Sequence, residues 1–272
     1  YVVAVRGEVR RRSEETVNPA QPTGMIEVRA AELRILSAAE TPPFEIEENS
    51  RTNEKVRLKY RYLDLRRPDM QRNIMLRHKV AKLTRDYFDS QGFLEIETPM
   101  LIKSSPEGAR DYIVPSRVHP GSFYALPQSP QQYKQLLMLS GYDRYMQIVR
   151  CFRDEDLRAD RQPEFTQIDL EMSFVDQDDV IAVNEGYLKY IFKEALGVEV
   201  ETPIQRLPYQ EAMDRFGSDK PDMRFGFELC DLSDLLTNCE FKVFSGALAA
   251  GGSVRGINFA GCADKFPRRE ID

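Results

Sequence analysis

The sequence contains no tryptophan, only two histidines and no long apolar run. A membrane-spanning helix needs about 20 consecutive apolar residues, and no stretch of this chain approaches that length. The first residues also lack the basic, then apolar, then small-residue pattern of a signal peptide. We therefore expect a cytoplasmic protein with no membrane partner.

Cysteine is also scarce, and the four thiols lie far apart without any C-x-x-C pair. Such pairs are the usual ligand spacing of structural zinc sites, and only His78 and His119 could supplement the thiols. The sequence thus predicts no metal site within these residues and reduced, mostly buried thiols. The cysteines are Cys151, Cys230, Cys239 and Cys262.

A net charge of -6 argues against a protein whose whole surface attracts nucleic acid, although a local basic patch could still bind phosphates. One such patch runs from Arg51 to Arg67, where seven basic residues accompany two acidic ones. Two interpretations stay open for this segment. It could contact the phosphate backbone of a polyanion, or it could be a solvated hinge with ordinary surface charges.

Residues 1–36 alternate apolar and polar positions around a break rich in Pro, Gly and Asn at 18–24. This pattern predicts two antiparallel strands that form the end of a small β-barrel. Helical spacing from Ile74 to Gln91 predicts an amphipathic helix ended by Gly92 in the left-handed conformation. The pattern of residues 93–101 then predicts a strand in which Pro99 removes a hydrogen-bond donor.

Residues 129–132, Ser-Pro-Gln-Gln, are typical of a helix start. Ser129 would be the N-cap, Pro130 the first helical residue, and Gln132 the partner that completes a capping box. Gln131 and Lys134 would then project from one face of the helix N-terminus, where the helix dipole favours anions.

Two strand patterns, Tyr145 to Arg153 and Glu164 to Phe174, enclose ten mostly charged residues and predict a long-looped antiparallel hairpin. A helix from Val180 to Leu196, closed by Gly197, follows. Polar side chains of the second strand share one face with an aromatic ring, which could stack on a base and bind an amine. A half-exposed sheet with a hydrated face is the open alternative. The polar face carries Phe165, Gln167, Asp169 and Glu171, and the other face carries Thr166, Ile168, Leu170, Met172 and Phe174.

The segment Phe152-Arg153-Asp154-Glu155, with the charged loop and residues 163–169 after it, resembles the second signature motif of class II aminoacyl-tRNA synthetases. Residues 92–101 resemble the first, dimer-forming motif, and residues 105–112 and 125–131 resemble the bacterial-type aspartyl enzymes of that class. The resemblance implies an α+β fold with an antiparallel catalytic sheet flanked by helices. It assigns the end of an anticodon-binding OB-fold barrel to 1–47, a hinge to 48–72, the catalytic domain to 73–224, and the start of a GAD-type insertion to 225–272.

This resemblance also implies an activity, in which ATP activates aspartate and the aspartyl group passes to the 3′ end of a tRNA for aspartate or asparagine. The enzyme would be a homodimer, with Mg²⁺ on the ATP phosphates. Arg153, as the catalytic residue, would bridge the aspartate carboxylate and the ATP α-phosphate. The other aspartate-binding positions would be Glu107, Ser129, Gln131, Lys134 and Asp169, with Lys134 on the substrate side chain, and the other ATP-binding positions Asp154, Glu155, Gln162 and Phe165.

Two further expectations come from the resemblance. The loop Lys103 to Ala109, which carries Glu107, would close over bound substrate as a lid. The chain begins at Tyr1 and stops before the third motif of the class, which indicates a fragment, and we expect little or no activity from this polypeptide alone.

Three rival interpretations stay open. The second motif is shared with the enzymes for asparagine and lysine, although Lys134 favours a substrate with a carboxylate side chain. A non-catalytic RNA-binding paralogue would be expected to lose Arg153, Glu155 or Phe165, and all three are present. A generic OB-fold binding protein would explain only the first segment.

Overall fold

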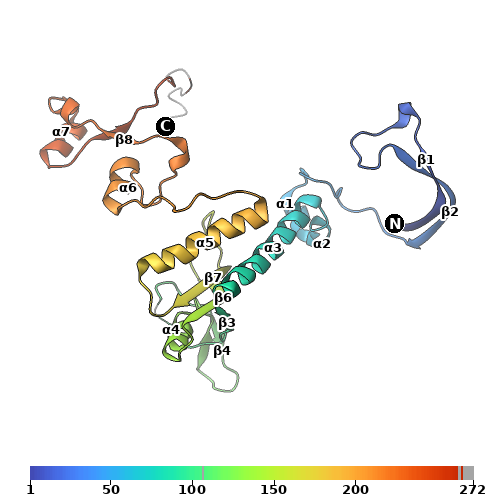
Figure 1. Ribbon diagram of the computed structural model, residues 1–272, viewed down its shortest axis with the longest axis horizontal. Coiled ribbons are helices and arrows are strands. Elements are labelled where there is room, and N and C mark those ends of the chain that lie inside the picture. Colours follow the sequence, from blue (N-terminus) through green and yellow to red (C-terminus); the bar gives the residue numbers. More distant parts are fainter. Residues whose placement is uncertain (106, 263–264, 266–272) are drawn as a thin grey trace. The chain divides into compact units, whose positions relative to one another are not determined.

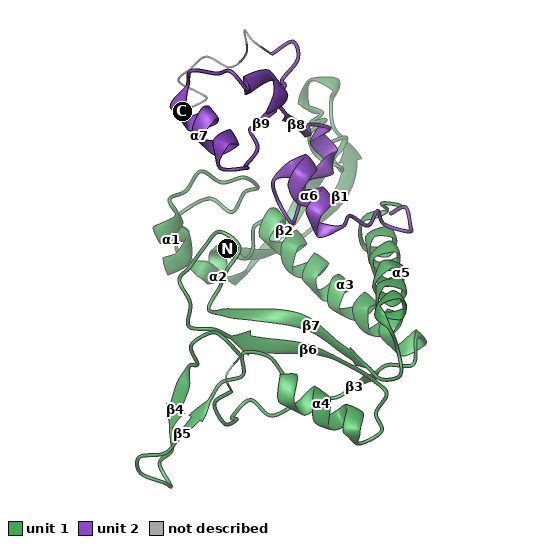
Figure 2. Cartoon of the chain, turned by 90° about the vertical axis from the view of Figure 1, so that its left-hand side faces the viewer, with its two compact units in different colours: residues 1–199 green, residues 200–272 purple. Residues whose placement is uncertain are grey.

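The computed structural model describes residues 1–105, 107–262 and 265 (Figure 1). The chain divides into two compact units, residues 1–199 and 200–272 (Figure 2). The boundary between the units comes before residue 225, where the sequence predicted the insertion to start. The four-segment domain assignment stays a prediction.

The first unit begins with the predicted hairpin of β1 (Val2–Arg11) and β2 (Ile26–Ser37), which are antiparallel. Its register shifts between Arg6 and Gly7. A Cβ at Gly7 would lie 2.2 Å from the carbonyl oxygen of Arg29, so only glycine fits at this irregularity. The short 3₁₀ helix η1 (Glu14–Thr16) lies between the strands.

The predicted hinge contains two short helices, α1 (Glu54–Lys59) and α2 (Arg61–Asp64). The Asp64 side chain is fully buried, and Arg67 donates to it at 2.9 Å while Arg61 and Arg57 also pair with it. Three of the seven basic residues therefore pair with a buried carboxylate, so this part of the segment is not a solvated hinge, and the phosphate contact stays a prediction. Arg67 also donates from Nε to the carbonyl oxygen of Glu47 at 3.1 Å, which fixes the start of the segment.

Helix α3 (Pro68–Ser90) confirms the predicted amphipathic helix and begins earlier, because a proline fits the first helical position. Gly92 follows it with φ +78°, as predicted. The strand predicted for residues 93–101 was wrong beyond its start, since β3 spans only Leu94–Glu95. Ile96 still donates to Met146, but the chain then leaves the sheet before Pro99.

Strands β6 (Arg144–Phe152) and β7 (Glu164–Met172) form the predicted antiparallel hairpin, and β3 pairs with β6 in parallel. Helix α5 (Gln177–Leu196) starts at a capping box on Asp176 and ends at Gly197, which has φ +70°. The placement of Phe174 on the apolar face was wrong. The strand ends before it, and Phe174 is 96% exposed with φ +58°.

Helices α3 and α5 cover the apolar face of β6 and β7 (Figure 2). Phe88, Phe93 and Met146 form the buried centre of this core, with Leu170 and Met172 packed against them. The two helices approach closely at Gly186 of α5, where a Cβ would lie 2.3 Å from the Tyr87 hydroxyl oxygen of α3.

The rest of the first unit comprises β4 (Ile113–Pro115), β5 (Phe123–Ala125) and α4 (Gln131–Leu139). No helix in the described part of the chain is long and apolar enough to cross a membrane. All four cysteines are free, but only Cys151 is buried, so the prediction of mostly buried thiols was wrong. The second unit contains α6 (Tyr209–Phe216), η2 (Met223–Phe225), β8 (Leu229–Asp231), η3 (Asp234–Leu236), α7 (Lys242–Ala249) and β9 (Arg255–Ile257).

Candidate active site

The polar face of the β6–β7 hairpin lies under helix α4, on the side of the sheet away from α3 and α5 (Figure 2). Directly paired residues of antiparallel strands share a face, so β6 contributes to it as well. The sequence had identified only the β7 half of this face, and the pairing register supplies the other half. The pairs are Tyr145 with Glu171, Gln147 with Asp169, Val149 with Gln167, and Cys151 with Phe165.

Lys134 of α4 reaches down to this face and pairs with two carboxylates of β7. Its Nζ lies 3.1 Å from Asp169 Oδ1 and 3.2 Å from Glu171 Oε2. The side chains of Lys134 and Asp169 are each only 12% exposed. The second oxygen of Asp169, Oδ2, is buried and has no hydrogen-bond partner among the described residues. An unsatisfied buried carboxylate oxygen of this kind is a place for a donor from a ligand.

Burial and the neighbouring charges shift the pKa values of Lys134 and Asp169 in opposite directions. Burial raises the pKa of Asp169 above its ordinary value, and Lys134 only partly offsets this effect. Burial also acts to lower the pKa of Lys134, but Asp169 and Glu171 outweigh it and the pKa is raised. Lys134 is therefore a fixed cation at neutral pH, with more than one carboxylate in reach.

Glu107 lies against the start of α4. The Ser129 hydroxyl donates to its Oε2 at 2.6 Å, and the Ser105 hydroxyl donates to its Oε1 at 2.9 Å. Ser129 Oγ also accepts from the Gln131 N–H at 3.3 Å. The predicted capping box was wrong, because α4 starts at Gln131 with Pro130 as its N-cap. The proposed lid loop includes residue 106, which lies outside the described residues.

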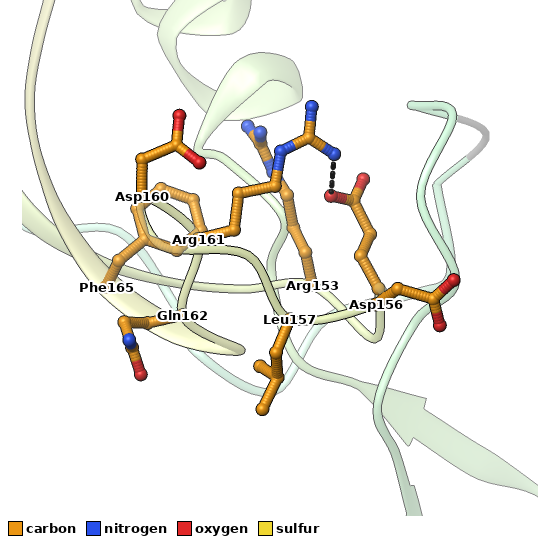
Figure 3. A pocket seen from close by; sticks show the side chains of 8 residues that line it. Arg153, Asp156, Leu157, Asp160, Arg161, Gln162 and Phe165 are labelled. Atoms are coloured by element: carbon orange, nitrogen blue, oxygen red, sulfur yellow. Dashed lines mark hydrogen bonds and ion pairs between the residues drawn. The ribbon is translucent and has the colours of Figure 1, made fainter. Parts of the chain in front are cut away.

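Beyond the hairpin, the charged loop between β6 and β7 folds around a pocket of about 290 Å³ (Figure 3). The guanidinium carbon of Arg153 lies 5.0 Å from the centre of the Phe165 ring. Arg161 closes the rim by donating to Glu155 at 3.2 Å. A planar aromatic ring beside arginine side chains suits a nucleotide base and its phosphates. The pocket is lined by Arg153, Glu155, Asp156, Leu157, Asp160, Arg161, Gln162 and Phe165.

Asp154 is the predicted ATP-binding residue that does not line this pocket. Its backbone N–H donates to the carbonyl oxygen of Arg110 at 3.0 Å, and Arg110 Nε donates back to the Asp154 carbonyl at 3.2 Å. These contacts tie the loop after β6 to the segment before β4. In the structure Asp154 therefore helps to fix the position of the loop after β6, and its contact with ATP stays a prediction.

Cys151 is a fully buried residue of the polar face and pairs with Phe165. Its thiol donates to Gln167 Oε1 at 3.2 Å. Burial raises the pKa of this thiol to about 11, and the charges of four predicted site residues modulate it: Arg153, Asp169, Glu107 and Lys134. The charges of predicted aspartate-binding and ATP-binding residues therefore both act on this one buried thiol, and the assignment of these residues to a common site stays a prediction.

Sequence reasoning missed two buried amides of this region. Gln147 accepts from Tyr145 at 2.7 Å and from Thr98 at 3.0 Å, and the strand register was the signal that could have located it. Gln128 is 3% exposed and hydrogen-bonds to the loop that carries Glu107. No periodicity indicates Gln128, because it lies in the irregular segment before α4.

Comparisons with known proteins relate this chain to one family. Residues 53–247 match the family described as tRNA synthetases class II (D, K and N). The whole chain aligns at 72% identity with 46% of the length of an aspartate–tRNA ligase from Ruminiclostridium cellulolyticum. It aligns at 69% identity with 45% of the length of an aspartate–tRNA(Asp/Asn) ligase from Lachnoclostridium phytofermentans. The chain therefore spans less than half the length of these curated relatives.

A solved structure has the same fold at lower identity. It is an asparaginyl-tRNA synthetase from Pyrococcus horikoshii complexed with asparaginyl-adenylate, with a TM-score of 0.59 and 24% identity. The match covers 72% of this chain and 43% of that one. The α+β class expected from the sequence is confirmed by this likeness.

Proposed function

This chain belongs to the class II tRNA synthetases of the D, K and N group, and from that premise we propose that it serves as part of an aspartate–tRNA ligase. The reaction would activate L-aspartate with ATP and then transfer the aspartyl group to the 3′ end of tRNA. The names of the relatives that are 69–72% identical support this choice of reaction.

The observation that carries the choice of aspartate is the environment of Lys134. A substrate carboxylate can join this buried cation, while the substrate ammonium can donate to the free Oδ2 of Asp169. Asparagine would bring a neutral amide to Lys134 and lose the charge pair. Lysine would bring a second cation, which is repelled.

We propose that Arg153 acts between the aspartate-binding residues around Lys134 and the ATP-binding residues around Phe165. Its guanidinium can hold the aspartate α-carboxylate and the ATP α-phosphate together, because a planar fork binds both kinds of oxyanion. Its stacking on Phe165 restricts the side chain before substrate binds. The adenine would lie on Phe165, with Glu155 and Gln162 beside the nucleotide.

The proposed chemistry needs no protein nucleophile. A carboxylate oxygen of aspartate attacks the α-phosphorus of ATP, a new O–P bond forms, and the bond to the bridging oxygen breaks to release pyrophosphate. The terminal ribose hydroxyl of tRNA then attacks the carbonyl carbon of aspartyl-adenylate, and AMP leaves. Positioning and charge stabilisation by Arg153 and Lys134 would supply the catalysis.

Other components of the proposal concern partners. Mg²⁺ would arrive on the ATP phosphates, whose oxygens are its preferred ligands. No group of three or more His, Cys, Asp and Glu side chains that could hold a metal ion by itself lies within the described residues. The tRNA would be that for aspartate, with asparagine tRNA as a second candidate, and the enzyme would be a cytoplasmic homodimer.

The test is pyrophosphate exchange into ATP by the complete gene product, with aspartate, asparagine and lysine in parallel. We expect exchange with aspartate alone and a loss of about 100-fold or more in the Arg153→Ala variant, as for removal of a charge-stabilising group. Exchange that prefers asparagine or lysine would reassign the substrate. A folded protein without any exchange would favour the non-catalytic RNA-binding interpretation.

A further inference from the structure

The segment that carries Glu107 is anchored at both ends on one buried residue. Ile102 and Ala125 exchange two backbone hydrogen bonds, of 3.0 and 2.8 Å, and Ile113 pairs with Ala125 in the β4–β5 hairpin. Ala125 is 2% exposed. The chain thus leaves this point of the fold after Ile102 and returns to it at Ile113, and the described residues between them need further contacts to hold their positions.

Gln128, which precedes α4, holds the loop between Ile102 and Ile113 through its side-chain amide. Its Nε2 donates to the carbonyl oxygen of Ala109 at 2.9 Å, and its Oε1 accepts from the Ala109 N–H at 3.1 Å. The second hydrogen of Nε2 goes to Asp111 Oδ1. Both donors and the acceptor of this buried amide are therefore used on one short segment, which is a specific arrangement.

Asp111 extends the support to the other end of the loop. Its Oδ2 accepts from the Ser104 hydroxyl at 2.5 Å, while its Oδ1 faces Gln128. Burial acts to raise the pKa of Asp111, but hydrogen bonds from Ser104, Gln128 and the Ser105 N–H outweigh it and lower the pKa. The carboxylate is charged at neutral pH and joins Ser104, near the start of the segment, to Asp111, near its end.

Glu107 lies between these two ends, and its carboxylate meets Ser129, the residue next to Gln128. Two consecutive residues thus hold the segment. Ser129 hydrogen-bonds to the Glu107 side chain, and Gln128 hydrogen-bonds to the Ala109 backbone. We propose that Gln128, acting with Asp111, is a positioning residue that fixes Glu107 for contact with the amino-acid substrate. This inference rests on the proposed function, because it assigns Glu107 to aspartate.

The test is the Gln128→Glu variant, which keeps the size of the side chain but places an oxygen where Nε2 donates to Ala109 and Asp111. We expect the KM for aspartate in pyrophosphate exchange to rise by about tenfold, as for a weakened hydrogen-bonded contact. The KM for ATP should stay within about twofold, because Gln128 does not contact the Arg153–Phe165 pocket. Hydrogen exchange at the Ala109 amide should become faster.

Two further variants sharpen this test. Adding Asp111→Asn to Gln128→Glu reverses the amide and the carboxylate, so one hydrogen bond can re-form and part of the aspartate KM should be regained. Gln205→Glu makes the same change at an exposed position of the second unit and should alter neither KM.

The outcomes separate this inference from the proposed function. An unchanged aspartate KM in Gln128→Glu, or equal rises in the KM for aspartate and ATP together with a lower Tm, would overturn the positioning role. A wild-type protein without aspartate-dependent exchange would refute the proposed function. In that case hydrogen exchange at the Ala109 amide still tests whether Gln128 holds the segment. Faster exchange in Gln128→Glu than in the wild type would show that it does, and an unchanged rate would refute it.

Discussion

Lys134 is the residue on which substrate choice depends in the proposed function. It is held at 3.1 Å from Asp169 in a nearly buried position, so its charge is directed rather than solvated. A cation that already faces two carboxylates can accept a third only if the substrate also supplies a donor to them. Aspartate does so, because its ammonium can satisfy Asp169 Oδ2 while its side chain approaches Lys134.

We expect Lys134→Met to raise the KM for aspartate by about 30-fold or more, the effect of losing a charge-assisted hydrogen bond. The methionine keeps the apolar stem of the side chain, so α4 should stay packed on the sheet. The measurement is pyrophosphate exchange over a range of aspartate concentrations. Lys134→Arg, which keeps the charge, is the matched control, and an unchanged aspartate KM in Lys134→Met would exclude this residue from substrate binding.

At the scale of elements, the segment between the first hairpin and α3 is held by an ion-pair cluster around Asp64. The buried carboxylate faces Arg57, Arg61 and Arg67, and Arg67 also binds the backbone of Glu47. Burial acts to raise the pKa of Asp64, but the arginines, Arg67 first, outweigh it and lower the pKa. The segment is therefore a structured connection.

The sign of the pH dependence follows from that lowered pKa. A carboxyl group with a lower pKa in the folded state adds stability above its unfolded pKa of about 4 and loses it as the pH falls through the folded value. We expect Asp64→Asn to lower stability at pH 7 by roughly 2 kcal/mol or more, since the buried Arg67 loses one of its two carboxylate partners and keeps only Asp69. The difference from wild type should shrink below about pH 4.

Thermal unfolding followed by circular dichroism between pH 3 and pH 7 measures this effect. The control is Asp86→Asn, which removes a carboxylate that pairs with Lys82 on the exposed surface of α3 and should cost under about 1 kcal/mol. Equal Tm changes for Asp64→Asn and Asp86→Asn would contradict a structural role for the cluster.

For the whole molecule, the exposed first half of α3 supports the proposed homodimer. Ile74 and Met75 are 56% and 65% exposed, and Leu94 on the neighbouring strand β3 is 52% exposed. Leu94 lies in the segment that resembles the dimer-forming motif, and Ile74 and Met75 lie in α3, the helix that precedes this segment. Large apolar side chains that are more than half exposed are typical of a surface that another chain covers.

We expect the protein to sediment as a dimer and Met75→Glu to weaken its self-association by at least about tenfold, because a charge would be buried in the interface. Sedimentation equilibrium over a range of protein concentrations is the measurement. Val118→Glu is the control, since Val118 lies at the exposed turn between β4 and β5. A monomer at all concentrations, or equal effects of the two variants, would contradict an interface at α3.

The sequence by itself determined the elements with strong local signals: the first hairpin, α3 and α5 with their glycine ends, and the β6–β7 hairpin with its polar face. These features depend on side-chain periodicity and on caps, which act within a few residues. Motifs along the chain also indicated Arg153, Phe165, Lys134 and Asp169 as site residues, and the structure pairs Lys134 with Asp169 and places Arg153 over the Phe165 ring.

Only the tertiary structure decided which long-range partners these residues meet. The pairing register between β6 and β7 places Gln147 and Cys151 on the polar face. A hydrogen bond between residues 19 positions apart, Gln128 and Ala109, brings Gln128 to the loop that carries Glu107. The pairing of Arg67 with the buried Asp64 also depends on tertiary structure, because local composition had left this arginine as part of a hinge or a phosphate contact. Contacts between distant segments depend on how elements pack, and packing is not encoded in the periodicity of any one segment.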